Sequence, residues 1–214
     1  MKTTRFFLTV LLIAFLAITT GCASFNAAGK MPDFNNPSST DRARLSTKIG
    51  TDASITICPV KEKEEAEKYF DEDFISAGIL AVAVHADCSV ETTLVAATLI
   101  PKSGVPVSSM DSKEIYAVMK RGYGARTVAG WFFGLYIGAP ILAYQTYKTN
   151  ERIQQDLDGA EGTTGKLLKV GNFPKGNTEG FLCFKVNDPT TVKGTLKLVF
   201  QRSGKLAEYN LDVN

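Results

Sequence analysis

The sequence contains a single histidine, His85, among 214 residues. Nucleophilic hydrolases need a nucleophile, a base and a group that orients the base, and histidine is the most frequent base. His85 stands inside an apolar stretch that is typical of a strand, so the usual triads cannot be assembled around it. We therefore expect a protein that is not an enzyme, without catalytic residues and without a cofactor. Carboxylate chemistry stays open, because two carboxylates with raised pKa in one cleft would be enough for acid and base catalysis.

Cysteines are also few, and none of the four stands in a CxxC spacing. Apart from Cys22, the chain holds Cys58, Cys88 and Cys183, and His85 alone could add an imidazole ligand to them, so we expect no metal site. In an oxidising compartment three cysteines leave two alternatives, which are one disulfide with one buried thiol or three buried thiols. Cys183 lies in an apolar strand pattern, which favours a core position for it.

The chain begins like a secretory signal. Lys2 and Arg5 precede an apolar run, residues 6–18, and the run ends in Thr19-Thr20-Gly21-Cys22. This ending resembles the lipobox of bacterial lipoprotein precursors, in which a small residue precedes a cysteine that is diacylated and becomes the mature N-terminus. Gly21 and Cys22 match that pattern, whereas Thr19 stands where leucine is usual.

The resemblance covers only the first 22 residues and implies lipidation of Cys22, with palmitate as an acyl chain. The alternatives are an ordinary signal cut near Ala23 and an uncleaved anchor helix. In the lipoprotein class, aspartate directly after the cysteine usually retains the protein in the inner membrane. Here Ala23 and Ser24 follow, so the resemblance implies a protein that is lipid-anchored in the outer membrane and faces the periplasm.

An excess of positive charge is absent as well. The full chain has 24 Lys and Arg against 22 Asp and Glu, and removal of Lys2 and Arg5 with the signal leaves 22 against 22. A neutral chain without a basic run lacks the electrostatic footprint that nucleic acids require, so we expect no nucleic-acid partner.

Removal of residues 1–21 as a signal peptide leaves 193 residues, enough for one domain. Residues 22–44 are rich in Asn, Ser, Pro and Ala without apolar periodicity, which predicts a flexible tether. A tether of this length has a root-mean-square reach on the order of 25 Å.

Six segments combine strand-like alternation or apolar runs with flanking turn residues: 53–59, 79–86, 92–100, 180–186, 194–201 and 206–213. The second and third segments are separated by residues 87–89, which predicts a hairpin between them. Between the two groups of strands, Asp111 and Glu114 have the spacing of a capping box at the start of a helix.

Three strands alone make a marginal domain, so we expect the two groups to share one core. The prediction is a mainly β protein with a helical insertion, an antiparallel Ig-like β-sandwich with a Gly-rich helical hairpin. Its sandwich halves would be residues 45–107 and 161–214, and the insertion residues 108–160.

Residues 127–147 contain no charge and are long enough for a membrane span of about 30 Å. Gly130, Gly134 and Gly138 would form one stripe on a helix, which predicts close contact with another helix. Because both strand groups must lie on the same side of a membrane, we expect a reversal near Pro140. The resulting hairpin either enters the leaflet that holds the anchor or packs on the sandwich, and the stripe suggests self-association.

Two functions fit these predictions. The first is a non-enzymatic envelope protein, anchored through Cys22 and possibly residues 127–147, that presents a binding or scaffold surface to an envelope partner. The second is an accessory lipoprotein of a secretion or envelope-assembly complex, in which an exposed strand edge pairs with a client or a channel subunit. We favour the first, and an exposed strand edge would favour the second.

Overall fold

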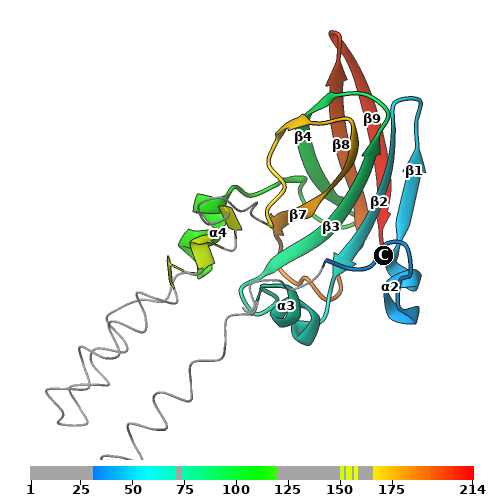
Figure 1. Ribbon diagram of the computed structural model, residues 1–214. Coiled ribbons are helices and arrows are strands. Elements are labelled where there is room, and N and C mark those ends of the chain that lie inside the picture. Colours follow the sequence, from blue (N-terminus) through cyan, green and yellow to red (C-terminus); the bar gives the residue numbers. More distant parts are fainter. Residues whose placement is uncertain (1–30, 71–73, 120–149, 152, 156, 159–165) are drawn as a thin grey trace, which may run out of the picture.

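The computed structural model describes residues 31–70, 74–119, 150–151, 153–155, 157–158 and 166–214. The described chain is mainly antiparallel β-structure with short helices beside it (Figure 1). The apolar stretch 127–147 lies outside the described residues. Among the helices that the structure describes, none has both the length and the hydrophobicity to span a membrane.

Two antiparallel sheets carry the fold. The first contains, in spatial order, β1 (Ser46–Ile49), β2 (Ala53–Val60), β3 (Ile79–Cys88) and β7 (Gly176–Lys185). The second contains β5 (Val107–Ser108), β4 (Thr92–Pro101), β8 (Gly194–Arg202) and β9 (Lys205–Val213), with β6 (Gly171–Phe173) also paired to β4. Both predicted groups of strands therefore contribute to both sheets.

One apolar core lies between the two sheets. Successive side chains of a strand point to opposite faces, and in β3 the even-numbered residues Leu80, Val82 and Val84 belong to this core. Leu196 and Leu198 of β8 belong to the same core. Each fully buried side chain of this size contributes about 1.5–3 kcal/mol of hydrophobic stabilisation, so this core is a large favourable term.

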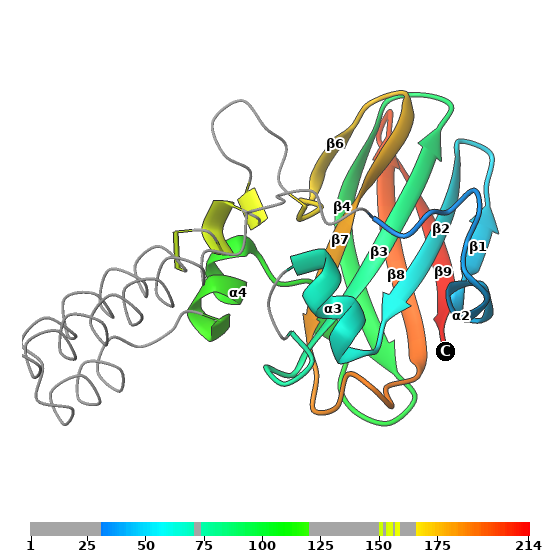
Figure 2. The same ribbon diagram turned by 60° about the horizontal axis from the view of Figure 1, so that its bottom comes forward.

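A second core covers the outer face of the first sheet. It contains the odd-numbered β3 residues Ile79, Ala81 and Ala83, together with residues of α3 (Lys63–Phe70) and α4 (Ser112–Met119). Helical residues between 150 and 158 add Ile153 and Leu157. Figure 2 shows α3 and α4 on the same side of the first sheet. The outer face of the second sheet carries no such layer among the described residues.

Helix α3 packs through one apolar stripe. Ala66, Tyr69 and Phe70 are buried at a spacing of three and four residues. The Phe70 ring stacks on Phe74 at 4.1 Å between centroids and meets Phe181 of β7 at 4.6 Å. The stripe thus joins the helix to the sheet through aromatic contacts.

The capping box at the start of α4 is confirmed. The backbone N–H of Asp111 donates to Glu114 Oε2 at 2.9 Å, and the backbone N–H of Glu114 donates to Asp111 Oδ1 at 2.8 Å. Ile115 then enters the second core. The N–H of Met110 donates to the carbonyl of Cys183, which holds the start of the helix at the edge of β7.

The predicted hairpin between residues 79–86 and 92–100 is wrong, because the two segments belong to different sheets. β3 pairs with β2 and β7, whereas β4 pairs with β5, β6 and β8. β3 is apolar on both faces and therefore takes the middle of the covered sheet. The short link after Cys88 carries the chain across to the second sheet, where the alternating pattern of β4 suits a sheet with one exposed face.

The predicted tether 22–44 is too long, because its last part is folded against the body. Helix α2 (Ser39–Arg44) begins with Ser38 as its N-cap, whose Oγ accepts from the N–H of Asp41 at 3.1 Å. Before it, Met31 and Phe34 pack against the second core.

The approach of β8 to β4 depends on Gly194. A Cβ atom there would overlap the carbonyl oxygen of Ile100 and lie 2.8 Å from Pro101 Cα. We expect Gly194→Ala to lower the free energy of unfolding by about 1–3 kcal/mol, since backbone atoms must move to relieve the overlap. Urea denaturation of the purified chain measures the effect. Gly204→Asn is the control, because Gly204 has open space and a left-handed φ of 78° that asparagine tolerates. Equal unfolding midpoints for Gly194→Ala and the wild type would contradict the close approach.

Candidate functional site

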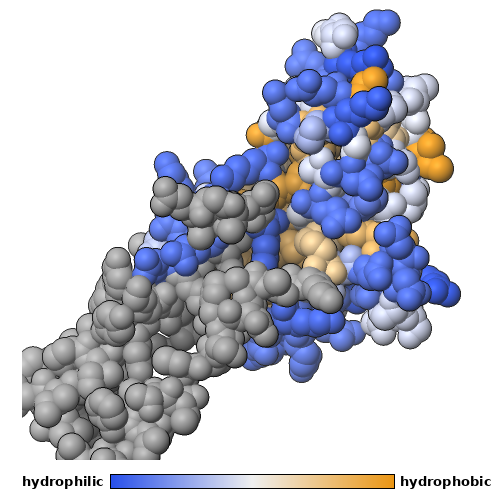
Figure 3. Space-filling model, viewed as in Figure 1, coloured by the Kyte–Doolittle hydropathy of each residue, from blue (hydrophilic) through white to orange (hydrophobic). Residues whose placement is uncertain are grey.

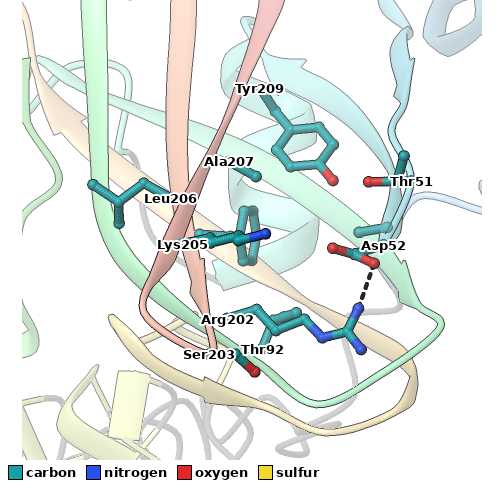
Figure 4. A pocket seen from close by; sticks show the side chains of 11 residues that line it. Thr51, Asp52, Thr92, Arg202, Ser203, Lys205, Leu206, Ala207 and Tyr209 are labelled. Atoms are coloured by element: carbon teal, nitrogen blue, oxygen red, sulfur yellow. Dashed lines mark hydrogen bonds and ion pairs between the residues drawn. The ribbon is translucent and has the colours of Figure 1, made fainter.

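A cleft of about 460 Å³ opens at one end of the two-sheet body, and we call it the hairpin-end cleft. The turn between β1 and β2 forms one side, and the turn between β8 and β9 forms the other. The first turn belongs to the first sheet and the second turn to the second sheet. Thr92, the first residue of β4, also lines the cleft (Figure 4), and its hydroxyl donates to Cys88 Sγ.

The β8–β9 turn places two cationic side chains at the rim. Ser203 and Gly204 have φ angles of 47° and 78°, and two successive residues with positive φ form the tight turn that suits the twist of paired strands. The register then sets Arg202 directly opposite Lys205. Leu206, the next residue, leaves 64% of its surface exposed beside the cleft.

An ion pair joins the two turns across 150 residues of sequence. Arg202 Nη1 lies 2.6 Å from Asp52 Oδ1, as Figure 4 shows. The carbonyl of Asp52 also accepts from the N–H and the Oγ of Ser89, at 2.9 Å and 3.0 Å. Because both charged side chains are partly exposed, the pair adds less than about 1 kcal/mol to stability. Its main effect is to fix the shape of the rim.

Tyr209 forms the floor of the cleft. Its side chain is buried, and its ring meets Phe200 edge to face at 5.6 Å between centroids. Gly50 packs directly on this ring, since a Cβ there would lie 2.5 Å from the hydroxyl oxygen. Burial raises the pKa of Tyr209, the charge of Asp52 raises it further, and a hydrogen bond with the backbone of Ala53 opposes the shift. The phenol is therefore a neutral hydrogen-bonding group at physiological pH.

These groups can bind a ligand but do not form a catalytic arrangement. The carboxylate of Asp52 is held by Arg202, and the serine and threonine hydroxyls have no imidazole beside them. His85 lies on the outer face of the first sheet, where its Nδ1 is 2.8 Å from Glu179 Oε1 and its ring contacts Phe34. Within the described chain, no cluster of three or more histidine, cysteine or acidic side chains could hold a metal ion.

The other residues that the sequence singled out lie mostly outside the described part of the chain. Cys22 and the glycines Gly130, Gly134 and Gly138 are all in undescribed segments, so their predicted roles stay predictions. The same holds for the predicted Gly-rich hairpin.

Cys58, Cys88 and Cys183 are free and buried. Of the two alternatives, three buried thiols is therefore the observed one. Cys58 and Cys183 belong to the core under the helices, and Cys88 belongs to the core between the sheets. Burial raises the pKa of Cys58 to about 12 and also raises that of Cys183. Such thiols are poor nucleophiles.

A buried ionic cluster between α2 and α3 was not predicted. Arg44 binds Glu65 with two hydrogen bonds, at 2.7 Å and 3.0 Å, and its Nη2 also lies 3.0 Å from Asp41 Oδ1. All three side chains are less than 15% exposed. Burial raises the pKa of Glu65 despite the hydrogen bonds and charge of Arg44. Burial also tends to raise the pKa of Asp41. The hydrogen bond from Ser38 and the charge of Arg44 outweigh burial, so the pKa of Asp41 is lowered.

This cluster could be read as a pair of catalytic carboxyl groups, but its contacts support a structural role. It contains two carboxyl groups with pKa values shifted in opposite directions, which can indicate an acid and a base. However, Arg44 occupies both oxygens of Glu65, and neither carboxyl lines the hairpin-end cleft. The cluster therefore attaches α2 to α3 and lies outside the hairpin-end cleft.

Comparison of the chain with protein-family models, with curated proteins and with solved structures gives no match.

The ionic cluster predicts a strong and pH-dependent effect of Arg44→Met. Two buried carboxyls would lose their common counter-charge, so we expect unfolding to become easier by about 3–5 kcal/mol at neutral pH. Acid should reduce this loss. A carboxyl whose pKa is raised in the folded state destabilises the fold where it is ionised, so the penalty disappears as the pH falls through the raised pKa of Glu65. Urea denaturation from pH 4 to 8 measures it.

The double variant Arg44→Met/Glu65→Leu is the matched control. Replacing a buried ion pair by apolar side chains is often nearly neutral, so most of the stability should return. A loss from Arg44→Met that is equally large at pH 4 and at pH 8 would show that unpaired carboxylates are not its cause.

Proposed function

We propose that the protein is a non-enzymatic binding or scaffold protein that is lipid-anchored through Cys22 in the outer membrane and faces the periplasm. The observation that carries the binding role is the hairpin-end cleft. It combines a fixed ion pair, an aromatic floor and an exposed leucine, and it contains no nucleophile beside a base. The anchor rests on the Gly21-Cys22 ending of the signal sequence.

We infer that the two sheets form an Ig-like sandwich. In Ig domains one sheet holds strands A, B and E in that order, and the other holds C, F and G. Taking β2, β3 and β4 as A, B and C, and β7, β8 and β9 as E, F and G, the first sheet has the order A-B-E and the second the order C-F-G. β5 then extends the second sheet beside strand C, and the helical insertion stands where strand D would be.

The folded N-terminal segment supports a body that stays close to the membrane. Because residue 31 already packs on the second core, only residues 23–30 separate it from Cys22. Eight residues span at most about 28 Å when fully extended. The tether is thus shorter than the sequence predicted. A membrane that holds the lipid on Cys22 would therefore lie within reach of the sandwich.

The contacts at the edges of β7, β1 and β9 favour this proposal over an accessory role in a secretion or assembly complex. That alternative requires an open edge for strand addition. The free edge of β7 instead receives hydrogen bonds from Leu168 and Met110, and its Phe181 donates to Lys166. On the other side β1 and β9 face each other, and the N–H of Asp212 donates to Ser46 Oγ at 3.0 Å.

Replacement of residues 1–22 by a cleavable signal without the cysteine tests the anchor. We expect this variant to leave the membrane and appear as a monomer in the periplasmic fraction, because Cys22 is the proposed anchor. Detergent-free fractionation and size-exclusion chromatography measure both properties, and the wild-type chain is the control. Membrane retention or large assemblies would instead point to a second membrane or self-association element, such as residues 127–147.

Photo-crosslinking in cells tests the hairpin-end cleft. A crosslinking amino acid at Leu206 should give discrete adducts with an envelope component, and Arg202→Ala should weaken them several-fold because the rim loses its ion pair. The control is the same amino acid at Asn210, an exposed residue of the same strand outside the cleft. Identical adducts from both positions would argue against a site at this end of the molecule.

A further inference from the structure

Lysine side chains gather around a second cleft, at the end of the body opposite the hairpin turns. The cleft has a volume of about 680 Å³ and lies between the loop 102–106 and the loop 186–193. Lys102, Lys185 and Lys193 line it, and we call it the lysine cleft. In Figure 1 the loop between β7 and β8 lies at the same end as α2, α3 and the C-terminus.

The backbone holds two of these lysines together. The N–H of Lys102 donates to the carbonyl of Lys193 at 2.8 Å, beside the close approach of Gly194 to Ile100 and Pro101. Both lysines are exposed, and neither ammonium group has a carboxylate partner among the described residues. The backbone therefore holds Lys102 and Lys193 next to each other, and each contributes a positive charge that has no carboxylate partner among the described residues.

Two further lysines add charge that nearby carbonyls do not neutralise. Lys185 Nζ donates to the carbonyl of Ala77 at 2.5 Å, and Lys61 Nζ donates to the carbonyl of Val192 at 2.7 Å. Burial lowers the pKa of Lys61, and the neighbouring charge of Lys193 lowers it further. The hydrogen bond to Val192 places the ammonium group of Lys61 beside the residue that precedes Lys193.

One carboxylate, Asp188, stands among the described residues that line the cleft, and its oxygens are already occupied. They accept from the N–H and Oγ1 of Thr190, at 2.9 Å and 2.6 Å, and from Thr191 Oγ1 at 2.7 Å. Asp188 therefore shapes its own loop. The lining keeps three positive charges against one negative charge, which favours a multiply coordinated anion such as a phosphate group.

A valine at the tip of the loop 102–106 points to a lipid as the source of that phosphate. Val105 lines the same cleft and leaves 78% of its surface exposed. An exposed apolar side chain flanked by lysines suits the boundary between headgroups and acyl chains, where the lysines meet phosphates and the apolar group leaves water. A small phosphorylated solute would give Val105 no apolar partner. Figure 3 shows that hydrophobic residues reach the described surface of that view only in small separate areas.

We propose that the lysine cleft binds the phosphate groups of anionic phospholipids in the membrane that holds the anchor. The identity of that membrane rests on the proposed function, whereas the chemistry of the cleft does not. Each lysine near an anionic lipid surface strengthens binding roughly fivefold. The cleft therefore orients the body on a membrane to which the lipid on Cys22 attaches it.

The test uses the full chain in neutral maltoside micelles to which phosphatidylglycerol is added stepwise. Val105→Cys carries an environment-sensitive fluorophore in every sample, in a Cys22→Ser background, since the other native thiols, Cys58, Cys88 and Cys183, are buried and resist labelling. We expect a saturable change in fluorescence. Lys102→Gln/Lys193→Gln should weaken it on the order of twenty-five-fold, which is fivefold for each lysine. The matched control, Lys48→Gln/Lys175→Gln, removes two exposed lysines that lie outside the cleft and should bind like the parent.

Three results would overturn the proposal. The first is no response to phosphatidylglycerol. The second is an equal loss in both double variants, which would show general attraction between charges. The third is saturation by inorganic phosphate at the same concentration, which would assign the cleft to a soluble phosphate compound. The titration needs neither acylation of Cys22 nor fractionation of cells, so its failure would not affect the proposed anchor, and a failed anchor would not affect this result.

Discussion

β3 carries apolar side chains on both faces, and most of the fold serves to remove these two faces from water. The second sheet covers one face, and α3, α4 and the helical residues between 150 and 158 cover the other. The chain after the insertion serves both cores at once, because Leu167 packs into the helical core and Leu168 into the core between the sheets. The N–H of Leu168 donates to the carbonyl of Phe181, and the N–H of Phe181 donates to the carbonyl of Lys166, so this segment also covers the edge of β7. The insertion is therefore part of the fold at its two ends, whatever its middle contributes.

The helical layer has an ionic border as well as an apolar interior. Arg44 joins α2 to α3. Its guanidinium is mostly removed from water, and burying that charge is tolerated only while Glu65 and Asp41 pair with it. This condition fixes the N-terminal segment more strictly than apolar contact would, because an apolar helix end could slide. It also explains why residues 31–44, a segment with the composition of a linker, are folded against the body.

Sequence reasoning succeeded where the deciding contacts are local. The capping box of Asp111 and Glu114 needs only residues three apart, and the alternation of 92–100 marks a strand wherever its partners lie. It failed where a distant partner decides. Turn-forming residues after β3 suit a hairpin and a crossing between sheets equally well. The hairpin-end cleft joins Asp52 to Arg202, and the ionic cluster joins Arg44 to Glu65. The two residues of each pair are far apart in the sequence, so no local pattern predicts either contact.

The two ends of the body differ in how their charges are balanced, and this difference suits two simultaneous contacts. At the hairpin end, Asp52 neutralises Arg202, so recognition there depends on shape and on hydrogen bonds more than on net charge. At the opposite end, lysines face neutral carbonyls and keep a net attraction for anions. β3 has ten residues, and ten residues of strand span about 33 Å. A body resting with its lysine end on a membrane would hold the hairpin-end cleft about that far from the membrane surface, where a partner can reach it without displacing lipid.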